Sequence, residues 1–566
     1  MSAARSRSPT MAMASDDEES RYNYRLAKPL PFELRQHCGI YFEEKLYSQA
    51  LSLLLNILTC GTVASSPAFV PSPQHLALAA TLLVHPSTTT RAKTTEEQEA
   101  ANAALQLLRL TNTLVGPVAA KFDVAFTFTH FDSSRHGGRR RADDSGTASG
   151  VRDDENAPLN LDLGQSGSLW SRAEDFWHAV GWAFNCSVLH PNRWERWQLW
   201  LEFMCEALED DWSERKRQLE DLGESSQPGT PSKRREAILK QSLIFKFLTS
   251  NTTYGRNRRI LRAIFANGSP TSVNEFREVF KNELKELKRE EDGKLKKREV
   301  DVNIDEGQYG DYMSLDEEES DEVEMTRTRP KRARRGAKRG ESAARTAEND
   351  SYELPDSIYA DGGVASLGGF KSLALRQRLL HLLSEVSQYL PDAFIRLEEL
   401  YHLFVENIRH LPLPIFQAFV APSALSYFTA AEQSSLCEIL LYRMRESAAP
   451  ESDEAYLSQK KLEECFLPYA ANTASVVDNA KVSILLESLL RLLAEDNLLR
   501  NTPELRQAVT EGILARNEKA QVEVRRSQNS RRMEDIEWCW LIESGERLLF
   551  LVEDILPQEQ DSAPQS

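Results

Sequence analysis

Apolar side chains recur every three to four positions along most of this chain, a spacing that places them on one side of an α-helix. The pattern is fullest over Pro191–Trp212. At about 100° per residue, the apolar residues of this segment form one broad stripe, and acidic residues fill the opposite face. The stripe carries four tryptophans: Trp194, Trp197, Trp200 and Trp212. Leu169–Cys186 has the same spacing, so the two segments predict a helical hairpin with a seam of tryptophan.

These tryptophans are the largest apolar side chains in the pattern. Each can bury roughly 150–250 Å², and burial stabilises a fold by about 25 cal/mol per Å². We therefore expect Trp194, Trp197, Trp200 and Trp212 to lie in the core. The alternative interpretation places one or two of the rings on the surface as a hot spot for a partner protein, because tryptophan is enriched at such sites.

Helical spacing continues on both sides of the hairpin. It predicts helices over Pro73–Val84, Thr95–Leu114, Ala237–Thr249, Asn257–Ala266 and Ser272–Lys288, and then over Leu373–Leu390, Ala393–Leu411, Ile415–Tyr427, Ala430–Arg445, Glu454–Tyr469, Ala474–Glu495, Pro503–Asn517 and Asp535–Ile555. Short connections between long helices favour antiparallel neighbours. Phe122–Phe131 instead alternates with period two, which favours a strand or a buried extended segment.

The first predicted helices, between residues 30 and 60, have a recurring set of apolar and small positions. The set comprises Leu34, Cys38, Tyr41, Tyr47, Ala50, Leu54 and Ile57, with a break near Glu44–Leu46. This arrangement resembles a tetratricopeptide-type helix pair. It departs from that pattern because Cys38 stands where glycine is usual and no proline closes the unit. The resemblance implies stacked helix pairs and a peptide-binding scaffold.

Polar, charged stretches divide the chain. Residues 1–28, 132–166, 291–364 and 557–566 contain too few large apolar side chains to offset the entropy of ordering, so we expect a disordered tail, an insertion, a linker and a second tail. The remaining parts are a helical lobe over 29–290 and another over 365–556. The predicted fold is all-α, either a helical repeat of solenoid type or a bundle.

Charge and cysteine usage indicate which kinds of partner and which cellular compartment are compatible with the sequence. The net charge is -17, but acidic and basic runs alternate, so the sign does not exclude a nucleic-acid partner. The seven cysteines are scattered and mostly lie within apolar patterns, which is typical of reduced thiols in an intracellular protein. No apolar run of membrane-spanning length and no signal peptide is found. We expect a soluble protein that is not secreted and does not contact a membrane.

Two short motifs bear on compartment and regulation. A dense basic run follows a proline in the linker and resembles a nuclear import signal; it comprises Pro330, Lys331, Arg332, Arg334, Arg335, Lys338 and Arg339. We therefore expect an import receptor as a partner and the nucleus as the location. Thr230 precedes Pro231, with Lys233 two positions beyond, a pattern that proline-directed kinases favour. Phosphorylation there would place a dianion beside basic side chains.

A second basic cluster lies in the predicted helix Asn257–Ala266 and just before it. It comprises Arg256, Arg258, Arg259 and Arg262. One interpretation is a solvated face, or an ion-pairing partner for the acidic helix at Glu202–Asp211. The other is a patch that contacts nucleic-acid phosphates, although the cluster lacks interleaved aromatic side chains.

The sequence carries none of the motifs that identify common enzymes. Phosphate-binding glycine loops, nucleophile elbows and paired Cys/His metal spacings are all missing, so we expect no catalytic residues, metal, cofactor or small-molecule substrate. The favoured function is a non-catalytic scaffold or adaptor in a nuclear complex for chromosome maintenance or transcription, with nuclear proteins as partners. The alternative is a nucleic-acid-binding protein that uses the basic clusters at 256–262 and 327–339.

Overall fold

The fold is all-α, as the periodicity predicts. The computed structural model describes residues 24–60, 66–129, 159–225, 232–250, 255–285, 363–421, 428–452, 454, 456–524 and 531–556. Within them the only strands are β1 (Ala27–Pro29) and β2 (Ala68–Val70), which pair in parallel with Ala27 opposite Ala68. β1 lies partly inside the range predicted as a disordered tail, and the Arg25 side chain donates to the Ser66 carbonyl oxygen at 2.9 Å.

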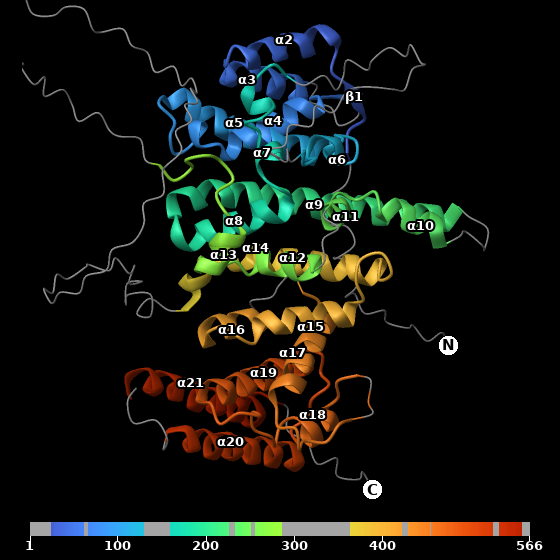
Figure 1. Cartoon of the computed structure of the whole chain (residues 1–566). Helices are drawn as coiled ribbons and strands as arrows, with labels where there is room; N and C mark the ends of the chain where they lie inside the picture. The colour runs from blue at the N-terminus through green and yellow to red at the C-terminus, as the bar shows by residue number, and fades with distance from the viewer. Residues whose placement is uncertain are drawn as a thin grey trace, which may run out of the picture. The chain divides into compact units, whose positions relative to one another are not determined.

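The N-terminal helices pack around α5. They are α2 (Phe32–Glu43), α3 (Tyr47–Thr59), α4 (Pro73–Val84), η1 (Pro86–Thr88), α5 (Thr95–Val115) and α6 (Phe122–Ala125), drawn in blue in Figure 1. The α2–α3 pair breaks at Glu44–Leu46, where the sequence predicts a break. A capping box fixes the start of α5, because Thr94 and Glu97 each accept a hydrogen bond from the backbone N–H of the other. α3 and α4 both pack against α5.

Two predictions in this region are wrong. Residues 122–129 contain no strand: Phe122 begins α6, Phe126 follows its last residue, and the two rings are 4.8 Å apart between centroids. The alternation of apolar residues therefore arises from a single helical turn followed by loop. The insertion predicted over 132–166 ends earlier, because Leu159, Leu161 and Leu163 are buried beside η3 (Asp162–Gly164).

The tryptophan hairpin consists of three helices instead of two. They are α7 (Leu169–Arg172), α8 (Phe176–Leu189) and α9 (Pro191–Ser225). The predicted first helix is divided because Asp175 caps α8, accepting a hydrogen bond from the His178 backbone N–H at 2.7 Å. α8 is buried on all sides, because every residue from Phe176 to Cys186 is buried. A Cβ at Gly181 would lie 2.3 Å from the Phe276 ring, so only glycine allows this approach.

The next helices are shorter than predicted. They are α10 (Ser232–Leu239), α11 (Leu243–Thr249), α12 (Arg256–Ile264) and α13 (Pro270–Glu275). Ser272–Lys288 does not form one helix, because the chain leaves α13 at Phe276 and turns so that Glu283 accepts a hydrogen bond from the Phe280 N–H at 3.2 Å. This turn brings Phe276, Phe280 and Glu283 into the core.

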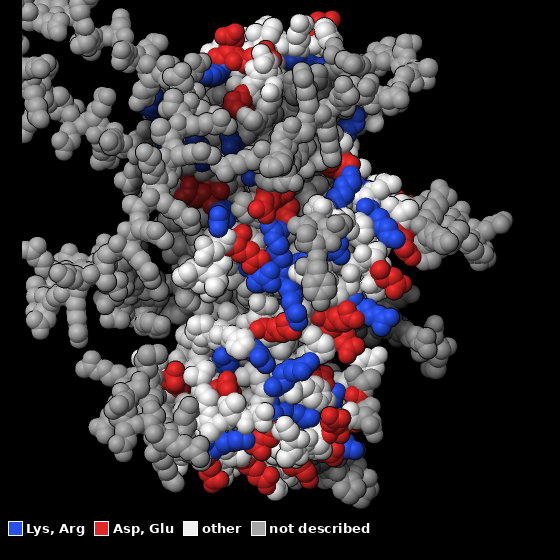
Figure 2. Space-filling view, in the orientation of Figure 1, with Lys and Arg blue, Asp and Glu red and all other residues white. Residues whose placement is uncertain are grey.

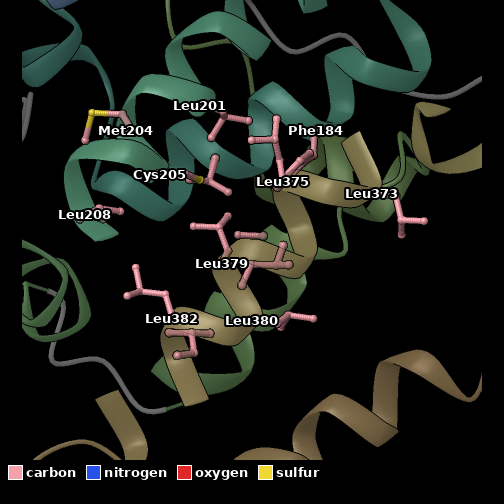
Figure 3. Packing of buried hydrophobic residues seen from close by; sticks show 14 of the residues in the cluster. Phe184, Leu201, Met204, Cys205, Leu208, Leu373, Leu375, Leu379, Leu380 and Leu382 are labelled. Atoms are coloured by element: carbon pink, nitrogen blue, oxygen red, sulfur yellow. The ribbon is translucent and has the colours of Figure 1, made fainter. Parts of the chain in front are cut away.

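The described residues on both sides of residues 286–362 belong to one compact unit. After η6 (Gly363–Leu367), α14 (Gly369–Tyr389) packs against α8, α9 and α12. Figure 3 shows Leu375 and Leu379 of α14 facing Leu201 and Cys205 of α9. The contact completes the apolar surroundings of α8 and α9, so α14 shares their core.

The C-terminal helices surround α19. They are α15 (Leu397–Ile408), α16 (Leu413–Val420), α17 (Ala430–Met444), α18 (Gln459–Cys465), α19 (Val476–Glu495), α20 (Pro503–Val524), α21 (Arg531–Phe550) and the terminal turn η7 (Leu551–Ile555). α16, α17, α20 and α21 all contact α19. Most of α19 is buried. It therefore forms the central helix of this group, as α8 forms the central helix of the preceding group.

Candidate functional site

The four tryptophans singled out from the sequence lie in the core. Trp197 and Trp200 are fully buried, and Trp194 and Trp212 retain 8% and 2% exposure. The indole N–H of Trp197 donates to Glu283 Oε1 at 2.7 Å, and that of Trp212 donates to Glu385 Oε2 at 3.1 Å. The rings therefore present no surface to a partner.

A buried ion pair joins α9 to the turn after α13. The Arg193 guanidinium donates through Nε to Glu283 Oε1 at 2.8 Å, and it also donates to the Thr89 hydroxyl at 2.9 Å. The side chain of Glu283 is completely inaccessible to solvent, and that of Arg193 is 4% exposed. The pair is buried and links three separate segments of the fold, which indicates a structural role.

Three of the four arginines of α12 are paired with carboxylates, although not with those of the predicted acidic helix at Glu202–Asp211. Arg259 bonds to Glu174 at 3.0 Å and to Asp175, the cap of α8. Arg262 donates through Nε and Nη2 to the two carboxylate oxygens of Glu275, each at 2.7 Å. Arg258 reaches Glu406 at 3.3 Å, and Arg256 donates to the side chain of Asn257 at 3.4 Å.

Figure 2 shows these paired charges on one face of the molecule. Basic side chains gather in the region of α12, and acidic side chains lie directly beside them. The carboxylates offset much of the positive charge that a phosphate would meet. The import motif at 330–339 and Thr230 both lie outside the described residues.

The titratable side chains with the largest shifts are buried. Burial raises the pKa of the Cys38 thiol to about 11 and the pKa values of Cys205 and Cys437 to about 12. Because the thiolate is the reactive form, these groups are poor nucleophiles at neutral pH. All seven cysteines are free thiols, and the described residues hold no cluster of three or more metal-ligating side chains. Among the described helices, none is both long and apolar enough to span a bilayer.

An open groove of about 560 Å³ lies where the end of α9, α10 and the α14–α15 connection meet. Its floor includes Tyr389, whose ring lies 5.3 Å from Lys216 Nζ. Lys216 in turn pairs with Glu385 at 2.7 Å. The groove also carries Arg235, Glu220 and Asp392, so charges of both signs line it. This mixture selects no single class of ligand.

The last helix presents the most coherent unpartnered surface among the described residues. Its outer side carries Ile536, Ile542, Phe550 and, in η7, Ile555, which are 60%, 50%, 55% and 53% exposed. Cys539 is exposed with them. We call these five residues the α21 row. Exposing several large apolar side chains on one face of a helix costs solvation energy, and such a face is a candidate site of association.

The opposite side of α21 faces the core. Leu541, Ser544, Leu548 and Val552 are buried there, against α19 and α20. At about 100° per residue they lie across the helix from Ile536, Ile542 and Phe550. α21 therefore has two apolar faces, of which only one is used inside the fold.

The α21 row was not predicted from the sequence, because the apolar spacing of Asp535–Ile555 predicts a helix without showing which of its faces is covered. The available signal was the excess of apolar residues, since a helix that packs on one side does not need Ile536, Ile542 and Phe550 as well. No family model matches this sequence, and no curated protein or solved structure matches it either.

Proposed function

We propose that this protein is a non-catalytic adaptor subunit of a nuclear assembly and that it binds a partner protein through the α21 row. The exposed row on α21 is the observation that carries the proposal. Nuclear location rests on the basic run at 330–339, whose residue types match what the acidic groove of an import receptor binds.

The rest of the described chain supports a binding role over catalysis. Its buried charges, such as Arg193 and Glu283, bond to groups of this chain, and its buried thiols are held in the protonated form. A protein of this kind acts by presenting a rigid helical face, and a row of anchors on one helix is the usual form of helix-mediated recognition.

The test compares two variants of the full chain in nuclear extracts after chemical cross-linking. Ile542→Asp together with Phe550→Asp places charge in the row without touching the buried side of α21. Phe370→Asp is the matched control, because Phe370 is 72% exposed but lies at the start of α14. Partners cross-linked to the wild-type protein and to the control should be lost from the double variant, while circular dichroism stays unchanged.

Two further outcomes bear on the proposal. If the double variant keeps every cross-linked partner, the α21 row is not the binding surface. Replacing Lys331, Arg332, Arg334 and Arg335 by alanine should move a fluorescent fusion out of the nucleus. The control replaces a shorter basic run, Arg139–Arg141, by alanine and should leave the fusion in the nucleus.

The alternative is direct binding of nucleic acid by the arginines of α12. It has less support because Arg258, Arg259 and Arg262 are paired with carboxylates. Retention of duplex or single-stranded nucleic acid at physiological salt, abolished by Arg256→Ala with Arg258→Ala, would favour it over the adaptor role.

A further inference from the structure

The exposed side of α21 combines apolar and acidic residues in one strip. At about 100° per residue, Ile536, Cys539, Ile542 and Phe550 fall within an arc of roughly 120°. At 1.5 Å per residue the strip from Ile536 to Phe550 is roughly 21 Å long, or four helical turns. This length matches a short helix laid along it.

Acidic side chains alternate with the apolar ones. Glu543, Glu546, Glu553 and Asp554 are all exposed. The one basic residue between Ile536 and Ile555 is Arg547. It is already bonded to Glu543 at 2.7 Å and to Glu487 of α19 at 2.8 Å. Arg547 offsets the charge of Glu543, so Glu546, Glu553 and Asp554 supply the negative charge that the strip offers a partner beside its apolar surface.

The neighbouring helix α20 also exposes apolar and acidic side chains. Leu514 is 57% exposed, and Glu511 and Glu518 on the same helix are exposed as well. α20 and α21 are in contact, and Gly545 of α21 lies next to Ile513 of α20. Lys519 pairs with Glu446 at 3.2 Å, so this basic residue does not offset the acidic ones beside Leu514.

Two occupants fit this surface poorly. A second copy of the chain would place the same acidic residues against one another, and like charges facing across an interface oppose association. The chain's own basic run at 327–339 has the right charge, but it contains no large apolar side chain to cover the isoleucines and Phe550. The complementary partner must supply both features.

We propose that the α21 row receives a basic amphipathic helix of another protein, with apolar residues at i, i+3 or i+4 and i+7 and with Lys or Arg flanking them. This inference rests on the proposed function and names the chemistry of the partner at the same site. Apolar anchors supply the buried centre of such an interface, and the flanking charges supply the selectivity and a fast, salt-dependent association.

The test uses designed peptides of about 20 residues, the length of a five- to six-turn helix. Three of the peptides have the same leucine stripe and differ only in the residues that flank it, which are Lys, Gln or Glu. A fourth peptide has the same residues as the Lys peptide in scrambled order. Fluorescence anisotropy measures binding to the full-length protein at low and at physiological salt. The Lys peptide should bind about tenfold more tightly than the Glu peptide at low salt. At physiological salt the two affinities should lie closer together. The scrambled peptide should bind poorly.

Matched variants locate the binding. Ile542→Asp with Phe550→Asp should abolish binding of the Lys peptide, whereas Phe370→Asp should not. Glu546→Gln with Glu553→Gln should weaken it several-fold and bring the Lys and Glu peptides closer together. The same charge change on α15, made as Glu398→Gln with Glu399→Gln, should leave affinity unchanged and so exclude general attraction to an acidic protein.

The failures are distinguishable. If all three ordered peptides bind equally and the Ile542, Phe550 variant loses them all, the partner chemistry is wrong but the binding surface stands. If the Lys peptide binds regardless of changes in the α21 row, both proposals fall. Dimerisation that the double variant abolishes, measured by light scattering, would identify a second copy as the occupant and overturn the inference.

Discussion

The guanidinium group of Arg376 lies over the ring of Phe184, 4.0 Å from its centroid, although the two residues stand on opposite sides of the segment 286–362. Arg376 is fully buried on α14 and Phe184 is fully buried on α8. The same guanidinium donates to the carbonyl oxygens of Ile264 and Ala266 at the end of α12, the latter at 2.9 Å. One side chain thus connects three helices.

We expect Arg376→Leu to destabilise the protein by about 3–5 kcal/mol, because it leaves the carbonyl oxygens of Ile264 and Ala266 buried without a donor. Arg376→Lys should destabilise the protein less, because an ammonium group can still donate to one of the two carbonyl oxygens. Urea unfolding followed by circular dichroism measures both. The control is Arg443→Leu at an exposed position, and an equal loss there would contradict the assigned role.

Arg193 and Glu283 provide a second test of buried charge. Removing one partner alone, by Arg193→Met or Glu283→Gln, should cost about 3–5 kcal/mol because the other loses its compensation. Replacing both should cost less than the sum of the single changes, which a double-mutant cycle in urea measures. Arg109→Ala, which breaks partly exposed pairs with Glu202 and Glu206 at 3.3 Å, should change stability by less than about 1 kcal/mol. Additive single effects would show that Arg193 and Glu283 do not interact energetically.

Two helical glycines should respond to alanine in opposite directions. A Cβ at Gly512 of α20 would lie 1.8 Å from the Leu467 carbonyl oxygen, so Gly512→Ala forces the backbone to move and should cost about 2–3 kcal/mol. At Gly545 of α21 the nearest atom would be Ile513 Cγ2 at 3.4 Å, an ordinary contact. Gly545→Ala should therefore be neutral or should stabilise α21 by about 0.5–1 kcal/mol. Melting temperatures of the two variants decide the sign.

His75 should make stability depend on acidity. Burial in α4, joined by the positive charge of Arg35, lowers its pKa from 6.5 to about 4. Between these values the unfolded chain binds more protons than the folded one, so stability is full above about pH 6.5 and falls as the pH drops towards 4. A shift of this size corresponds to about 3 kcal/mol. In His75→Leu, urea midpoints measured across this range should fall less steeply; an unchanged slope would assign the effect to His85, whose pKa is also lowered to about 4.

Helix positions were the most predictable part of the fold. Pro73–Val84 begins with a proline at its first position, and its apolar spacing ends where α4 ends. The predicted helices were wrong where another interaction ended a helix inside an apolar run. The Asp175 cap divides an apolar run that reads as one helix, and the turn that brings Glu283 to Arg193 ends a run that reads as another. The cap is a local contact that the apolar spacing hides, whereas the turn at Glu283 depends on its tertiary partner Arg193.

The candidate sites were harder to predict than the helices. Arg259 and Arg262 form a basic cluster in the sequence, but their partners Glu174 and Glu275 are identified only by the fold. Arg376 was not singled out at all, because a fully buried arginine is rare and nothing local distinguishes it from an exposed one. The tryptophans drew attention by their size, whereas the α21 row needed knowledge of which face of the helix is covered.

The packing of α14 on α9 has a consequence for synthesis. Leu201 and Cys205 leave the ribosome well before Leu375 and Leu379, which face them in the folded protein. At ~5–20 residues per second this interval lasts roughly ten to thirty seconds. During that time the apolar side of α9 is exposed on the nascent chain, where we expect a chaperone to bind it. A transcript truncated within codons 286–362 should therefore yield an insoluble polypeptide.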